Sequence, residues 1–105
     1  MDNKLLQKEM VTVVKSDEAK IIFEKSLRNL DPNALTPKGE IQSYEVDYDS
    51  IKHNPMGGIN VTLYVNNDKK LEINFTLDKV NGSLRNSGIS YTNELDKYKG
   101  EGEHD

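Results

Sequence analysis

The sequence contains no cysteine. This absence excludes disulfide bonds, cysteine-ligated zinc and thiol nucleophiles, although it does not by itself fix the compartment in which the chain works. Long apolar runs are also missing. No segment approaches the ~18–20 residues of a membrane span, and the polar start of the chain does not resemble a signal peptide. As written, the chain is expected to be soluble, with no membrane insertion by this segment.

Apolar side chains are scarce, and acidic side chains outnumber basic ones. Apolar residues make up 34% of the 105 residues, and 18 Asp and Glu outnumber 14 Lys and Arg. The length fits one domain with a thin core, which we place at residues 1–98, followed by an acidic tail at 99–105 that is expected to be disordered. The net charge of −4 argues against nucleic-acid binding, since phosphate contacts need clustered cations.

Two helical segments open the chain. Apolar side chains recur at helical spacing over residues 3–15 and again over residues 17–30. The two apolar stripes would point in opposite directions on one straight helix, so a break is expected at Ser16, a good N-cap residue. The second helix is expected to end at Asp31, because the proline that follows disfavours helical geometry in the residue before it.

Strands follow the helices. Alternating apolar and polar residues predict four of them, at about 40–48, 58–66, 70–77 and 83–91. Leu84 and Ile89 have opposite parity within the fourth strand, so a bulge is expected near Gly88. Helices first and strands after predict an α+β domain, with the helices on one face of a four-stranded antiparallel meander.

A segment containing proline and glycine, HNPMGG at residues 53–58, separates the first two strands. Pro55 fixes its own φ, and the glycine pair permits backbone angles closed to other residues. Met56 has two interpretations: it plugs the end of the thin core, which we favour, or it contacts a partner. The candidate contact residues are this segment and one tyrosine of the second strand: His53, Asn54, Pro55, Met56, Gly57, Gly58 and Tyr64.

His53 could instead serve chemistry, as a base or metal ligand with Asp47 or Asp49 and with Ser50 as a nucleophile. Such a site needs side chains that converge, whereas these residues lie on one short connector. No Gly-x-Ser-x-Gly elbow is present, and the spacings of zinc and calcium sites are incomplete. We therefore expect a turn histidine and a solvated strand edge, with no catalytic residue, metal or cofactor.

The outward face of the sheet is the second candidate surface. Its expected residues are polar: Asn60, Thr62, Tyr64, Glu72, Asn74 and Thr76. Such side chains can bind sugars or peptides, but a solvated antiparallel face carries the same residue types, and we favour that interpretation. Residues 60–62 and 74–76 also match the glycosylation sequon, which carries little weight inside strands.

Two stretches resemble a known family: residues 13–36, which include LRNLDPNALT, and residues 44–58, YEVDYDSIKHNPMGG. They are similar to a family of small Gram-positive bacterial proteins catalogued only as a domain of unknown function, and the similarity covers roughly residues 10–91. Members usually carry an N-terminal hydrophobic anchor or signal segment, so the resemblance implies a place outside the membrane but no activity. The order of helices and strands also resembles cystatin-like folds, which implies a cystatin-like roll.

These observations lead to one expected function and two alternatives. The expected function is a non-enzymatic binding or interaction module, placed outside the membrane, with a protein or cell-envelope component as its partner. The first alternative is a small hydrolase or metal-dependent enzyme that uses His53 with Asp47 or Asp49. The second is a protease-inhibitor-like module, by analogy with cystatin-like folds, in which residues 53–58 form a wedge. A cytoplasmic location is the alternative to export, and the oligomeric state stays open.

Overall fold

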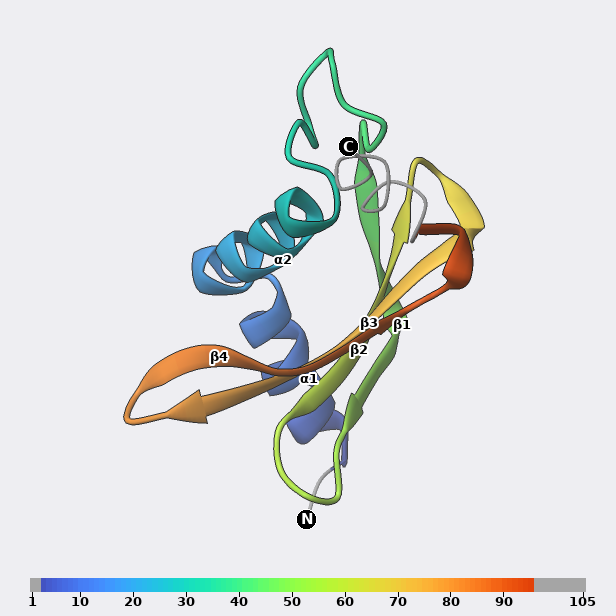
Figure 1. Ribbon diagram of the computed structural model, residues 1–105. Coiled ribbons are helices and arrows are strands. Elements are labelled where there is room, and N and C mark those ends of the chain that lie inside the picture. Colours follow the sequence, from blue (N-terminus) through green and yellow to red (C-terminus); the bar gives the residue numbers. More distant parts are fainter. Residues whose placement is uncertain (1–2, 96–105) are drawn as a thin grey trace.

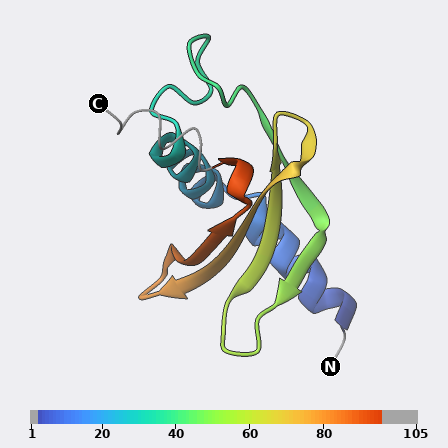
Figure 2. The ribbon, with the colours of Figure 1, turned by 45° about the vertical axis from the view of Figure 1, so that its right-hand side comes forward.

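The computed structural model describes residues 3–95, and the expected acidic tail at 99–105 lies outside them. Helices α1 (Asn3–Val14) and α2 (Asp17–Leu30) precede the remaining elements: β1 (Tyr44–His53), β2 (Ile59–Val65), β3 (Asp68–Val80), β4 (Ser83–Tyr91) and the short 3-10 helix η1 (Asn93–Leu95). The strands form one antiparallel sheet in the order β1-β2-β3-β4. Both helices lie on the same side of this twisted sheet (Figures 1 and 2). The expected α+β meander is confirmed.

The break between the helices follows from Ser16. Its side-chain oxygen accepts a hydrogen bond from the Ala19 N–H at 3.2 Å, which caps the start of α2. Asp31 leaves helical geometry at the other end, while its N–H still donates to the Leu27 carbonyl at 2.9 Å. Because the chain changes direction at Ser16, the apolar faces of α1 and α2 both pack into one hydrophobic core. No helix within residues 3–95 has both the length and the apolar content needed to cross a membrane.

The core lies between the helices and the inner face of the sheet. At its centre the rings of Phe23 in α2 and Phe75 in β3 meet edge to face, with centroids 5.0 Å apart. Buried strand residues around them follow the predicted alternation: Ile51, Val61, Leu63, Val65, Leu71, Ile73 and Leu77. One face of the sheet therefore packs against the helices, and the opposite face carries the polar side chains.

β1 begins later than the expected 40–48, because the N–H groups of residues 40–43 donate to the side chains of Asp31 and Asn66. It also ends later, beyond a bulge in its pairing with β2. Asp47 pairs with Thr62, but the next paired residue of β1, Lys52, faces Asn60. Ser50 lies inside the bulge, where its hydroxyl donates to the Asp47 carbonyl at 2.6 Å and accepts from the Thr62 N–H at 2.8 Å. The Ser50 hydroxyl thus accepts the hydrogen bond from the Thr62 N–H that a backbone carbonyl of β1 would otherwise accept. Pairing with β2 resumes after the bulge, and β1 continues to His53.

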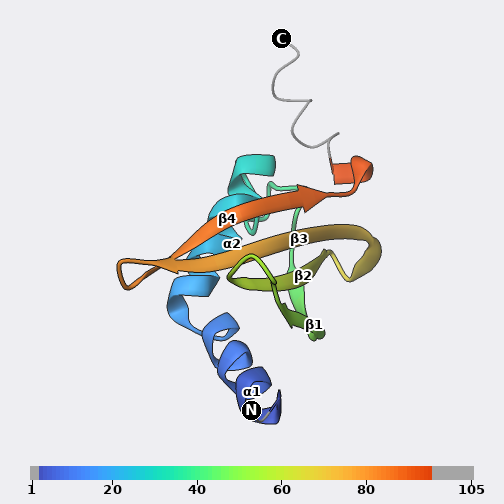
Figure 3. The same ribbon diagram turned by 90° about the horizontal axis from the view of Figure 1, so that it is seen from below.

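β3 extends past the expected 70–77 at both ends, because its two turns are tight. Residues 66–67 both have positive φ, at 55° and 57°, which is typical of a two-residue hairpin turn, and β3 starts directly after them at Asp68. Residues 81–82 have φ of 55° and 85°, so pairing with β4 continues to Val80. The β3–β4 hairpin consequently projects from the body of the domain (Figures 1 and 3).

The predicted bulge in β4 is present. The register between β3 and β4 shifts between Thr76, which pairs with Gly88, and Leu77. One extra residue of β4 is accommodated there, so Leu84 and Ile89 both reach the inner face despite their opposite parity. Ile89 nevertheless keeps 44% of its surface exposed, because β4 is an edge strand.

Candidate functional site

The connector between β1 and β2 is a tight turn organised by Asn54. Its carbonyl accepts a hydrogen bond from the Gly57 N–H at 2.8 Å, and its N–H donates to the Gly58 carbonyl at 2.9 Å. Its side-chain oxygen accepts from the Met56 N–H at 2.9 Å, while its side-chain N–H donates to the Asn60 side-chain oxygen at 3.1 Å. Four hydrogen bonds from one residue therefore fix the shape of residues 53–58.

The two glycines of the turn have different surroundings. Gly57 and Gly58 both have positive φ, at 110° and 94°, which residues with a side chain rarely adopt. A Cβ atom at Gly58 would lie 2.5 Å from the Leu77 carbonyl oxygen, whereas one at Gly57 would meet nothing within 4 Å. The base of the turn thus lies directly against the backbone of β3, and only its tip is free.

Met56 occupies that tip and has 95% of its surface exposed. The favoured expectation that it plugs the end of the core is wrong. The hydrogen bonds of Asn54 close the turn within a few residues, so the chain is too short to fold Met56 back toward the sheet. Buried Ile51 and Leu77 complete this end of the core instead.

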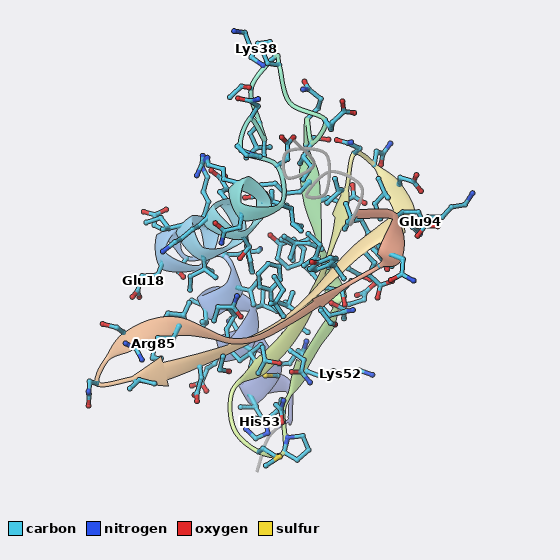
Figure 4. All side chains as sticks on the ribbon, in the orientation of Figure 1. Glu18, Lys38, Lys52, His53, Arg85 and Glu94 are labelled. Atoms are coloured by element: carbon cyan, nitrogen blue, oxygen red, sulfur yellow. The ribbon has the colours of Figure 1, made fainter. Side chains whose placement is uncertain are left out.

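His53 is exposed and lies at the base of the turn (Figure 4). It pairs with Ile59 on the helix-facing side of the sheet, whereas Asp47 pairs with Thr62 and faces outward. Asp47 accepts a hydrogen bond from the Asp49 N–H at 3.1 Å. Within residues 3–95 no three His, Asp or Glu side chains gather where they could hold a metal ion. His53 and Asp47 therefore face opposite sides of the sheet, and within residues 3–95 the His53 side chain forms no hydrogen bond with Asp47 or Asp49.

An apolar groove of about 300 Å³ lies beside the turn, between α1 and the sheet. Leu6 and Met10 of α1 form one wall, and Ile59 and Leu84 of the sheet form the other. His53 also lines this groove, so the groove and the turn open at the same end of the domain. Together they provide an exposed thioether side chain next to a partly apolar depression.

Tyr64, the remaining candidate contact residue, lies elsewhere. It is half-buried on the outward face, and its hydroxyl donates to the Asp47 carboxylate at 3.3 Å. Partial burial and the charge of Asp47 raise the pKa of Tyr64. Five positions of β2 separate it from Ile59 at the turn, which corresponds to about 16 Å along a strand. The structure therefore does not bring Tyr64 together with residues 53–58.

Side-chain hydrogen bonds cross the outward face between β2 and β3. Thr62 donates to the Asn74 side-chain oxygen at 2.6 Å, and Thr76 donates to the Asn60 side-chain oxygen at 2.9 Å. Asn54 joins this network from the turn through its bond to Asn60. A shallow groove of about 440 Å³ crosses the sheet above these pairs. These residues face outward, as the alternation predicts.

The organising role of Asp31 is not apparent from the pattern of the sequence. One carboxylate oxygen accepts from the Asn33 N–H at 3.1 Å, and the other accepts from the N–H groups of Glu40 at 2.7 Å and Ile41 at 3.0 Å. A Cβ at Gly39 would lie 2.1 Å from the Asn33 carbonyl oxygen, so this loop also requires glycine there. An aspartate directly after a helix predicts the local hydrogen bond from the Asn33 N–H. It does not predict the bonds from Glu40 and Ile41, which close the loop.

The fold and the turn define the class of protein: a small α+β domain with two helices on one face of an antiparallel meander and a rigid exposed turn at one end. Over residues 1–98 the chain matches the family described as "Protein of unknown function (DUF1310)", and it belongs to that family. No curated protein and no solved structure shows a significant match. The resemblance to a domain of unknown function is confirmed, and that description attaches no activity to the turn.

Proposed function

We propose that the domain is a non-enzymatic binding module that engages a protein partner through the turn at residues 53–58, with Met56 as the anchoring side chain. The observation that carries this proposal is the 95% exposure of Met56 on a turn that Asn54 holds with four hydrogen bonds. A turn already fixed loses little conformational entropy on binding. A methionine adapts to an irregular apolar pocket, and its burial contributes about 1.5–3 kcal/mol.

The apolar groove beside the turn supports the same proposal. A partner pocket that receives Met56 would place its rim against His53 and the groove wall formed by Leu6 and Met10. The buried area would then continue from one anchoring residue into a larger apolar contact, as in interfaces with a central anchor and a surrounding rim. Loss of the anchor should therefore weaken the complex more than loss of any residue at the rim.

A pull-down with matched variants tests this function. Wild type, Met56→Asp and Ile21→Asp are used as baits against extracts of the source cells, and the recovered proteins are quantified. Ile21 is the control because it is an exposed apolar residue of α2, at 66% exposure, outside the turn and the groove. We expect at least one protein whose recovery falls about tenfold or more with Met56→Asp, equivalent to ~1.4 kcal/mol, and stays unchanged with Ile21→Asp. Equal recovery of every protein by all three baits rejects the proposal.

We also propose that the domain works outside the membrane of a Gram-positive bacterium, where its partner is a component of the cell envelope. The support is the sequence resemblance to a family whose members usually carry an anchor or signal segment. The test is protease treatment of intact cells that express the tagged full-length protein. Degradation of the tag before lysis agrees with this location, whereas protection until lysis contradicts it.

The projecting turn favours one second candidate, a protease-inhibitor-like module. Such a module would insert Met56 and Pro55 as a wedge, and both residues are exposed. A panel of proteases assayed with wild type and Met56→Asp tests it. Inhibition that Met56→Asp abolishes supports the wedge, and no inhibition of any protease removes this candidate.

A further inference from the structure

The groove on the outward face of the sheet has an unusual lining. Charged residues make up 30% of the chain, yet none of the residues that line this groove is charged. The polar part of the lining consists of amides and hydroxyls, chiefly Asn54, Asn60, Thr62, Asn74 and Thr76. A charged ligand finds no opposite charge here, and an apolar ligand would bury polar groups without partners. The lining therefore fits a neutral ligand that carries many polar groups.

The two central asparagines keep unused donors for such a ligand. Asn60 and Asn74 each accept a threonine hydroxyl hydrogen bond through the side-chain oxygen. Neither side-chain NH₂ group donates to another residue within the described part of the chain, 3–95. The motif Asn-x-Thr occurs once in β2 and once in β3, and antiparallel pairing sets each asparagine opposite a threonine. The two amides are therefore diagonal neighbours, about 7–8 Å apart, which requires a ligand with several acceptors.

Gly88 gives a second, independent indication. It pairs with Thr76 at the edge of the groove, and its φ lies outside the range that side chains avoid. A Cβ there would lie 3.5 Å from Thr76, in ordinary contact, so neither backbone geometry nor crowding demands a glycine. A strand is normally weakened by glycine. Because Gly88 has no side chain, the hydroxyl of Thr76 and its hydrogen bond to Asn60 stay accessible from the groove.

A peptide strand does not fit this place. β2 and β3 are the central strands, with a neighbouring strand on each side, and where the bulge in β1 interrupts the pairing the Thr62 N–H of β2 is bonded to the Ser50 hydroxyl. Peptides that extend a sheet need a free edge with unpaired backbone groups. Recognition above β2 and β3 must therefore use side-chain amides and hydroxyls. From this geometry we propose that the groove binds a neutral oligosaccharide chain, whose hydroxyl and acetamide oxygens accept hydrogen bonds from Asn60 and Asn74.

The test is a ¹⁵N-NMR titration of the whole chain with two neutral probes, the tetrasaccharide of N-acetylglucosamine and maltotetraose. The expected result is saturable shifts of the side-chain NH₂ signals of Asn60 and Asn74 and of the backbone amide of Gly88. The Kd is expected at about 1 mM or tighter for at least one probe. A sulfated tetrasaccharide of similar length should bind at least tenfold more weakly, because the lining offers no cation.

Three variants make the test specific. Asn74→Asp retains the acceptor for Thr62 but loses the NH₂ donors, and it should weaken binding at least tenfold. Gly88→Val places a side chain over the groove and should abolish the shifts. Because valine is favoured in strands, the free energy of unfolding should not fall below that of wild type. Asn29→Asp on α2 is the charge-matched control and should bind as wild type does.

The outcomes separate this proposal from the role of the turn. Met56→Asp should leave oligosaccharide binding unchanged, since Met56 does not line the outward groove. Absence of saturable shifts with both probes overturns the proposal, as do shifts that persist in both Asn74→Asp and Gly88→Val. Perturbation of the same amides by an unstructured peptide, with no response to either sugar, also overturns it and assigns the groove to a peptide.

Discussion

The packing of the turn against β3 predicts a specific effect of Gly58→Ala. The added Cβ would lie 2.5 Å from the Leu77 carbonyl oxygen, well inside the 3.4 Å at which ordinary contact begins. Because the obstacle is backbone, the turn or β3 must shift by nearly 1 Å. The positive φ of 94° costs a further ~1–2 kcal/mol for a residue with a side chain. With an overpacking cost of ~1–3 kcal/mol, the free energy of unfolding should fall by about 2–5 kcal/mol.

Gly57→Ala is the matched control for that prediction. Gly57 has a similar positive φ, at 110°, but its Cβ would enter open space. This variant should therefore lose only the backbone contribution, about 1–2 kcal/mol. Urea unfolding of both variants, followed by circular dichroism, measures the difference. A loss for Gly58→Ala that equals the loss for Gly57→Ala would refute the contact between the turn and β3.

Three further predictions concern the side chains that hold the scaffold. Asp31→Ala removes the acceptor of three backbone N–H groups and should lower the free energy of unfolding by about 2–4 kcal/mol; a loss below about 0.5 kcal/mol in urea unfolding contradicts that role. Burial and the hydrogen bond to Glu24 raise the pKa of Tyr44 to about 12, so the unfolded chain loses this proton first as the pH rises. Stability should consequently decline by about 1–2 kcal/mol between pH 10 and 12, after allowance for solvent screening, and Tyr44→Phe should lack this part of the decline; identical alkaline profiles argue against it. Ser50→Ala leaves the Thr62 N–H without its acceptor, which should cost about 1–2 kcal/mol and speed hydrogen exchange at Thr62; unchanged exchange there would mean that the hydroxyl is dispensable.

Features with local causes could be predicted from the sequence. The helix break follows from the capping chemistry of Ser16 together with the change in apolar phase. The bulge in β4 follows from the conflicting parity of Leu84 and Ile89, which the sequence displays directly. The class of fold follows from the order of helical and alternating segments.

Features that depend on distant partners could not be predicted. The length of β1 rests on the hydroxyl of Ser50, which replaces a carbonyl only because the Thr62 N–H of β2 arrives beside it. The direction of Met56 rests on the four hydrogen bonds of Asn54, one of which reaches Asn60 on the next strand. Residue type and spacing do not encode these encounters, so the sequence favoured the plugged position of Met56, whereas the structure leaves its side chain exposed.

The central claim is that Met56 on its rigid turn contacts a partner protein, and photo-crosslinking tests it most directly. Benzoylphenylalanine is placed at position 56 in one variant and at position 21 in another, since Ile21 is also exposed, and intact source cells that express each variant are irradiated. We predict a discrete crosslinked species from position 56 that is absent from position 21 and contains a second protein. Identical crosslinking patterns from the two positions, or no crosslinked species from position 56, would contradict the account.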